Sequence, residues 1–212
     1  MTLRLEHLGY FSLPRGVQAH DPSLPAELAK RAKAGYGGRA LALSADRRHL
    51  WISGHEEGDL VALWGIPEVG GTAELRIGFR ELAPRAALSA AMLDQLVGLA
   101  DHEGKLWGLY QDYYDVDGRD GGRVSLWNGE RLVQVGAGEL KRHAGYLTTH
   151  DGSLWCGRSD GAGSADVKHG PALYRISMPL LNYGLESFSI PPRSDWTEAD
   201  RYTGLVFLPG YV

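Results

Sequence analysis

Gly98–Asn128 reads GLADHEGKLWGLYQDYYDVDGRDGGRVSLWN and is typical of three β-strands joined by a tight turn and a long acidic hairpin. The same order of strand, polar turn and Leu-Trp strand recurs around Leu50-Trp51 and Leu154-Trp155. A long Gly/Asp-rich connection and another apolar strand follow each time. A unit of short strands that recurs roughly every fifty residues predicts a repeat architecture, and four-stranded units of this length are typical of propeller blades.

About three complete blades of four antiparallel strands account for most of the chain, so the predicted fold is an all-β propeller. The expected strands are 40–43, 49–53, 60–66 and 73–82 in the first blade, 96–100, 105–110, 123–127 and 131–135 in the second, and 146–149, 153–157, 172–177 and 186–190 in the third. Turns such as Asn128-Gly129 and Asp151-Gly152 supply the positive φ angles that tight hairpins need. Short helical inserts are expected at Ser23–Gly35, which has the polarity of a helix, and in the alanine-rich segment 84–96.

One strand without a partner is expected at each end of the chain, at Leu3–Leu13 and Tyr202–Leu208. Propellers usually close by placing their N- and C-terminal strands in one blade. The 212 residues are therefore expected to form one domain that is part of a larger ring. Missing blades or a protein partner would then pair with its open edges. An open solenoid of three and a half blades is the alternative, and it would leave apolar edges exposed.

Composition narrows the classes of partner. The net charge of −4 arises from 22 basic and 26 acidic residues without long runs of one sign, which argues against nucleic-acid binding. No apolar run approaches the roughly 18 residues of a membrane span, and the first residues lack the pattern of a signal peptide. Cys156 is the single cysteine, which excludes an internal disulfide and a cysteine metal cluster. The composition indicates no cellular compartment.

The sequence resembles a family of uncharacterised bacterial β-propeller proteins with a GG…GH…P first unit and a YYDxDG segment in the next. The residues that carry the likeness are Gly37-Gly38, Leu50-Trp51, Gly54-His55, Ile66-Pro67 and the segment 113–118. The resemblance implies the fold, and because the family has no established activity it implies no catalytic residue. The short length of the chain and the insert at 84–96 depart from the family's pattern.

The connections of unequal length predict which edge of the blades carries function. The turns between the first and second strands are short in all three blades. The connections between the second and third strands, and those between blades, are long and polar. Loops longer than a hairpin needs are where a rigid scaffold carries its binding groups. We therefore expect the ligand at the edge from which the long loops leave, which we call the long-loop edge.

Three carboxylates occupy one register on these loops. Alignment of the blades on their Leu-Trp pairs places Glu56, Asp112 and Asp160 five residues after the tryptophan. An acidic arc around a central channel would attract a cationic or hydroxyl-rich ligand. The predicted ligand-binding residues are His55, Glu56, Asp112, Tyr114, Arg158 and Asp160. The simpler interpretation, that these are ordinary solvated loop residues, remains open.

A local cluster of carboxylates suggests a metal site. Asp115, Asp117 and Asp120 surround a glycine turn with carboxylates at nearly alternate positions, as loops that bind hard cations do. Calcium is the expected ion. The match is partial, because the segment lacks the full spacing and the glutamate at the twelfth position, and Asp-Gly pairs also occur in ordinary hairpins.

The residues of the long loops are compatible with two functions. The first is a ligand-binding or scaffold domain that binds a polar small molecule or carbohydrate at the long-loop edge. The second is a propeller hydrolase or lyase that acts on a carbohydrate or lactone and that calcium could assist. The fold cannot discriminate between them, because propellers carry both kinds of function. Convergent carboxylate, Asn or His side chains at the mouth of the channel would favour the enzyme.

Overall fold

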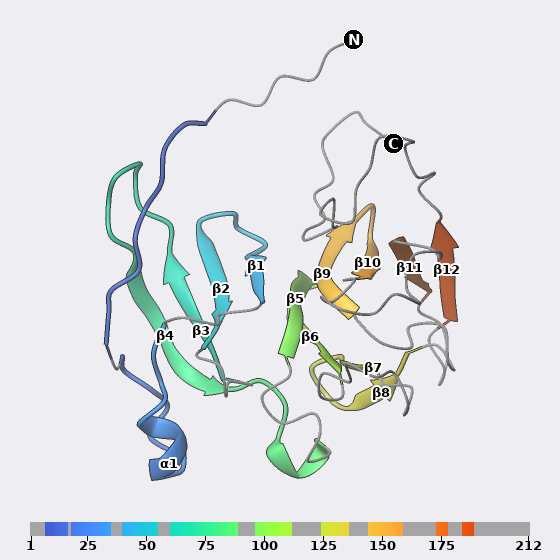
Figure 1. The fold of residues 1–212 in the computed structure, drawn as a ribbon, viewed down its shortest axis with the longest axis horizontal. Helices are drawn as coiled ribbons and strands as arrows, with labels where there is room; N and C mark the ends of the chain where they lie inside the picture. The colour runs from blue at the N-terminus through green and yellow to red at the C-terminus, as the bar shows by residue number, and fades with distance from the viewer. Residues whose placement is uncertain are drawn as a thin grey trace, which may run out of the picture.

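A computed structural model describes residues 7–16, 18–34, 40–54, 60–88, 96–111, 124–135, 144–158, 173–177 and 184–188. The described strands form three antiparallel sheets of four strands each, and within each sheet the strands pair in the order of the sequence (Figure 1). The predicted all-β class is confirmed. None of the helices in the described part of the chain has the length and apolar character needed to cross a bilayer.

The observed strands match the predicted ones, with ends that differ by at most two residues. Sheet 1 contains β1 (Leu41–Leu43), β2 (His49–Ser53), β3 (Leu60–Gly65) and β4 (Glu74–Glu81). Sheet 2 contains β5 (Leu96–His102), β6 (Lys105–Gln111), β7 (Val124–Trp127) and β8 (Leu132–Gln134). Sheet 3 contains β9 (Ala144–His150), β10 (Ser153–Arg158), β11 (Leu173–Ser177) and β12 (Gly184–Phe188).

Two-residue turns close the first hairpins of sheets 2 and 3. Glu103 and Gly104 have φ angles of 51° and 74°, and Asp151 and Gly152 have φ angles of 46° and 69°. A hairpin with two positive φ angles in its turn follows the right-handed twist of its strands, which favours the glycine at the second position of both turns. These residues were recognisable from the sequence because the requirement is local.

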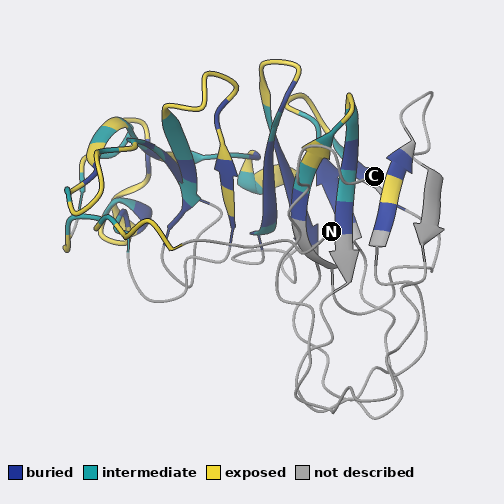
Figure 2. Cartoon of the chain, turned by 90° about the horizontal axis from the view of Figure 1, so that it is seen from above, coloured by how far each residue is buried: buried dark blue, intermediate teal, exposed yellow. Residues whose placement is uncertain are grey.

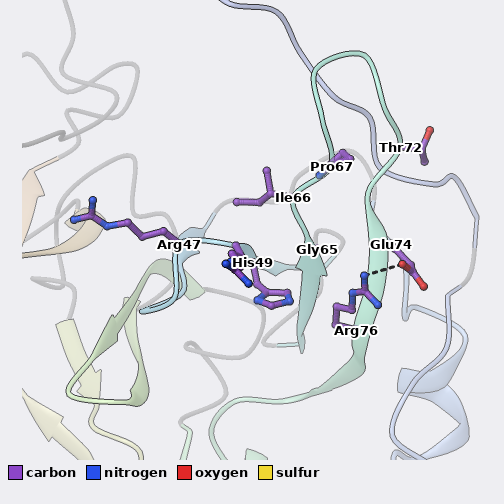
Figure 3. A pocket seen from close by; sticks show the side chains of 9 residues that line it. Arg47, His49, Gly65, Ile66, Pro67, Thr72, Glu74 and Arg76 are labelled. Carbon is purple, nitrogen blue, oxygen red and sulfur yellow. Dashed lines mark ion pairs between the residues drawn. The ribbon is translucent and has the colours of Figure 1, made fainter.

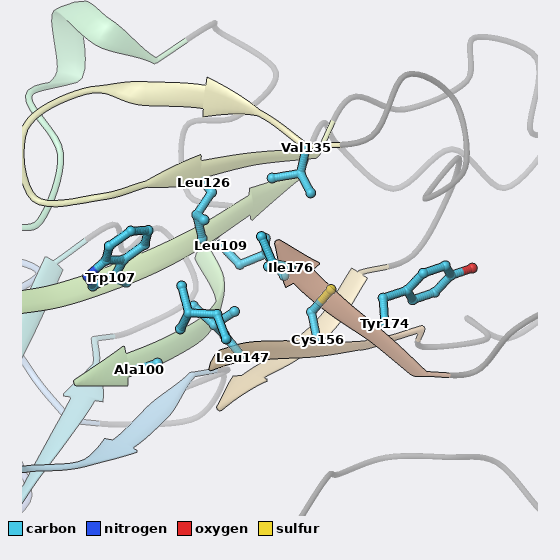
Figure 4. Packing of buried hydrophobic residues seen from close by; sticks show 10 residues of the cluster. Ala100, Trp107, Leu109, Leu126, Val135, Leu147, Cys156, Tyr174 and Ile176 are labelled. Atoms are coloured by element: carbon cyan, nitrogen blue, oxygen red, sulfur yellow. The ribbon is translucent and has the colours of Figure 1, made fainter. Parts of the chain in front are cut away.

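The sheets are arranged with their first strands together. β5 lies beside both β1 and β9, while β4, β8 and β12 lie away from this row (Figure 1). Sheet 2 is apolar on both faces because it packs between the other two. Leu99, Tyr110 and Trp127 belong to the core shared with sheet 1. Leu109 and Leu126 belong to the core shared with sheet 3 (Figure 4).

The N-terminal segment covers the other face and the outer edge of sheet 1. Leu24 and Leu28 pack in a third core with Trp64 and Phe79, on the face that points away from sheet 2. Ser12 pairs in parallel with Thr72, and its N–H donates to Gly71 O at 3.0 Å. His20 pairs in the same way with Phe79. The segment therefore satisfies backbone groups that an edge strand would otherwise expose.

This arrangement corrects the prediction for Leu3–Leu13. In its described part, residues 7–13, the backbone forms a single bridge at Ser12 and no regular strand. Because that bridge joins the segment to the edge of sheet 1, the segment has a partner that lies far along the sequence. Tyr202–Leu208, the strand expected at the other end, lies outside the described residues.

The predicted helices are much shorter than expected. Within Ser23–Gly35 the described helix is α1 (Ala26–Ala29), a single turn. Ser23 does not cap it, because the Ser23 N–H and hydroxyl both donate to Asp21 Oδ1, at 2.8 and 2.6 Å. In the second insert the described helical residues are a 3₁₀ turn at Arg85–Ala87, and residues 89–95 lie outside the described part of the chain.

Candidate functional site

Most of the predicted site falls on residues that the structure does not describe. These are the ligand residues His55, Glu56, Asp112, Tyr114 and Asp160 and the calcium ligands Asp115, Asp117 and Asp120. Arg158 ends β10, where its backbone pairs with Ala144. The acidic arc and the calcium loop therefore stay predictions.

The strands that lead to the arc do share one register. In each sheet a tryptophan is the third residue of the second strand. The paired residues are Trp51 with Ala42, Trp107 with Ala100, and Trp155 with Thr148. β2, β6 and β10 thus begin in one register, but they end at Ser53, Gln111 and Arg158, which lie two, four and three residues after the tryptophan.

The short turns lie at the opposite edge of the sheets, here called the turn edge. The Asp101 carboxylate at the end of β5 accepts a hydrogen bond from the Ala45 N–H in the β1–β2 turn, at 3.1 Å. This contact places the first hairpins of sheets 1 and 2 at the same edge. Figure 2 shows exposed hairpin turns projecting from one side of the sheets.

Contacts between a histidine and a tryptophan support the turns of sheets 2 and 3, and the pair in sheet 2 is buried. The His102 and Trp107 rings meet edge to face with centroids 5.6 Å apart, and those of His150 and Trp155 are 6.4 Å apart. Ser44 holds the corresponding position in sheet 1, where its hydroxyl oxygen accepts a hydrogen bond from the His49 N–H at 3.1 Å. These side chains pack and bond within their own hairpins, which indicates a structural role.

The β1–β2 turn of sheet 1 is longer than the other two and is organised by Asp46. Asp46 Oδ1 accepts hydrogen bonds from the Ser44 hydroxyl at 2.6 Å and the Arg48 N–H at 2.8 Å, and Asp46 Oδ2 lies 2.8 Å from His49 Nδ1. The hydrogen bonds from Ser44 and Arg48 lower the pKa of Asp46 from 3.8 to about 2, and His49 adds to the effect. The carboxylate thereby holds the turn in one conformation, with Arg47 at a φ of 57°.

Beside this turn three strands form the floor of a groove. His49, Gly65 and Glu74 are cross-strand partners on β2, β3 and β4, so their side-chain positions lie on one face of sheet 1. Gly65 leaves room for the Arg76 guanidinium, because a Cβ at Gly65 would lie 3.1 Å from Arg76 Nε. Arg76 Nη2 also contacts Glu74 Oε2 at 2.8 Å. His49 and Arg76 thus lie on either side of Gly65 (Figure 3).

This turn-edge groove has a volume of about 530 Å³. Its polar lining residues are Arg47, Arg48, His49, Thr72, Glu74 and Arg76. Three arginines and one glutamate line the groove, which gives the lining an excess of positive charge although the whole chain is acidic. Ile66 and Pro67 add an apolar wall. The arrangement suits an anion that also carries an apolar part.

Other chemical groups in the described residues have structural surroundings. Burial raises the pKa of the Cys156 thiol to about 12, so this sulfur is a packed core group and no nucleophile. In the described ranges no three His, Cys, Asp or Glu side chains lie close enough together to hold a metal ion.

Comparison with known proteins adds no family to this description. Neither the family models nor the curated proteins give a match to the chain.

Sequence reasoning missed the turn-edge groove. We expected binding groups only on long loops, and the β1–β2 turn is short. Its residues Asp46-Arg47-Arg48-His49 are nevertheless more basic than HEGK and HDGS, the equivalent turns of the other sheets. This difference in charge between equivalent turns was the sequence signal that could have indicated the groove. The contributions of Gly65 and Arg76 could not be read in this way, because they depend on pairing between strands.

Proposed function

We propose that the chain is a β-propeller ligand-binding domain that binds a polar small molecule or carbohydrate at its long-loop edge. The observation that carries the proposal is the row of first strands, in which β5 lies beside β1 and β9. Four-stranded sheets that meet along their first strands and pack face to face have the arrangement of neighbouring propeller blades. The resemblance of the sequence to bacterial propeller proteins supports the same conclusion.

The topology of the sheets favours the long-loop edge as the place where the ligand binds. Each sheet is a meander, so the connection from its second to its third strand leaves at the edge opposite its first turn. The connections at 112–123 and 159–172 exceed what a hairpin needs. They carry Asp112, Tyr114 and Asp160, and Arg158 ends the strand that precedes the second of them. Acidic and aromatic groups around a channel would bind hydroxyl or amine groups of a ligand.

The proposal is tested by substitution of two residues in different blades. Wild-type protein should bind one class of compound in a screen of neutral saccharides and polyamines, as measured by calorimetry. Asp112→Ala and Arg158→Ala should each weaken that binding by about tenfold, because each removes a charged hydrogen-bonding group.

Glu103→Ala is the matched control, because Glu103 is an exposed residue of the β5–β6 turn at the opposite edge. It should leave binding unchanged. Equal binding by all the variants, or no binding by the wild type, would contradict the proposal. Conversion of the ligand during the titration would instead support the hydrolase or lyase alternative.

A further inference from the structure

We propose that the turn-edge groove is a second ligand site, which binds a small organic anion through its phosphate or carboxylate group. The site lies at the edge opposite the predicted arc and does not rest on the function proposed above. It is carried by two observations, three arginines that line a hollow of about 530 Å³ and the absence of a side chain at Gly65, which leaves room for the Arg76 guanidinium.

Arg76 is the central cation. Its guanidinium lies over Gly65, with Nε 3.1 Å from the position that a Cβ would take there. Glu74 neutralises it only in part, because the side chains of Arg76 and Glu74 are 50% and 71% exposed and an exposed pair is weak. A ligand anion can therefore replace Glu74 with little loss. A guanidinium is also suited to such a group, because its planar fork donates two parallel hydrogen bonds.

Arg48 supplies the second cation, and hydrogen bonds fix its backbone in the turn. The Arg48 N–H donates to Asp46, and the Arg48 carbonyl accepts from the Ile66 N–H at 2.9 Å. Its backbone is thus tied both to its own turn and to the end of β3. Within the described part of the chain, neither Arg47 nor Arg48 forms an ion pair with a carboxylate. Arg47 extends away from the centre of the groove and adds positive charge at its rim (Figure 3).

The remaining walls define the rest of the ligand. Ile66 is 37% exposed and Pro67 follows it, so an apolar group of the ligand would lie against them. The volume exceeds what a single inorganic anion fills, since one water occupies about 30 Å³. The ligand class is therefore an anion with a small apolar body, for which phenyl phosphate and benzoate are the probes.

Calorimetric titration of the full chain tests the site with phenyl phosphate, benzoate and neutral benzyl alcohol. The two anions should bind and benzyl alcohol should not, and binding should weaken as salt rises. The stronger of the two anions identifies the group that the site takes, and either order supports the proposal. Arg48→Gln and Arg76→Gln should each weaken binding by about tenfold, because each removes a charge-assisted hydrogen bond.

Two further variants make the test specific. Arg15→Gln changes the same charge at an exposed residue outside the groove and should leave binding unchanged. Glu74→Gln should strengthen binding by up to about fivefold, because it removes the carboxylate that competes for Arg76. Melting curves confirm that each variant is folded.

Equal losses of binding for Arg15→Gln and Arg76→Gln, equal binding of benzyl alcohol and the anions, or no binding of either anion would overturn the proposal. Asp112→Ala should bind phenyl phosphate as the wild type does, which separates this site from the one at the long-loop edge.

Discussion

At the scale of single residues, Asp46 shows how one carboxylate organises a turn. Its three hydrogen-bond partners, Ser44, Arg48 and His49, all lie within the same turn. A carboxylate that accepts hydrogen bonds is stabilised in its charged form, which is why its pKa falls to about 2. The same contacts fix the backbone of Arg48, so this residue links the stability of the turn to the geometry of the groove.

We predict that Asp46 makes the protein sensitive to acid. Its folded pKa is about 2 and its ordinary value is 3.8. The stabilisation that the ionised Asp46 gives to the folded state is therefore complete above about pH 4 and is lost as the pH falls towards 2. Asp46→Asn should lower the melting temperature at pH 7 and flatten its dependence on pH between about 4 and 2.

The control for this prediction is Glu27→Gln. Glu27 is an exposed carboxylate on α1 whose contact with Lys30 spans 4.0 Å. An exposed ion pair of this kind contributes little to the stability of the fold. The melting temperature of the control should therefore depend on pH as that of the wild type does. An Asp46→Asn variant with the same pH profile as the wild type would show that the hydrogen bonds of Asp46 do not stabilise the folded state.

At the scale of elements, the N-terminal segment and β4 approach each other so closely that only glycine fits between them. A Cβ added at Gly78 would lie 2.9 Å from Ala19 O. Two backbone hydrogen bonds lie beside this contact. The Phe79 N–H donates to Ala19 O at 3.0 Å, and the Asp21 N–H donates to Phe79 O at 2.8 Å. Leu24 and Leu28 then anchor the segment in the core beside Trp64.

Gly78→Ala should therefore detach residues 18–21 from β4. We expect a loss of about 1–3 kcal/mol in the free energy of unfolding, the usual cost of adding a methyl group to a packed site. Hydrogen exchange of the Phe79 and Asp21 amides should become faster than in the wild type, since both bonds lie at the contact.

Glu74→Ala on the same strand, at a side chain 71% exposed, should change stability by no more than about 0.5 kcal/mol. Unchanged exchange at Phe79 in Gly78→Ala would mean that the segment does not depend on this close approach.

At the scale of the whole molecule, sheet 2 joins its two neighbours. Its two faces contribute to different cores, one with sheet 1 and one with sheet 3. The hydrogen bond between Ala45 and Asp101 adds a polar link between sheets 1 and 2. A chain whose cores share one sheet should unfold as a unit, because loss of sheet 2 exposes apolar surface on both sides.

Leu109→Ala tests this coupling. Leu109 is fully buried in the core between sheets 2 and 3, so its truncation should cost about 2–5 kcal/mol. Urea unfolding should remain a single transition when followed by circular dichroism and by tryptophan fluorescence. Leu43→Ala on β1, where the side chain is 48% exposed, is the matched control and should have a small effect. Separate transitions by the two probes would contradict the shared core.

Local features explain why the strands were predictable. Alternating and continuous apolar runs, the Leu-Trp pairs and the turns at Glu103-Gly104 and Asp151-Gly152 each depend on residues close together in the chain. Backbone sterics and side-chain alternation act over such short distances, so the pattern of residues is enough to locate strands and hairpins. The order of strands within each sheet followed from the same signals, because every described strand pairs with its sequence neighbour.

Contacts between distant residues could not be predicted in this way. Ser12 pairs with Thr72, and the groove brings His49, Gly65 and Arg76 together across three strands. The pairing of β3 with β4 also shifts register between Val61 and Trp64, which sets where Glu74 and Arg76 lie relative to Gly65. A shift of one residue turns a side chain to the opposite face of a sheet. The positions of the strands could therefore be predicted from the sequence. Register and packing, in contrast, decide which edge of sheet 1 the N-terminal segment covers and where the basic groove forms.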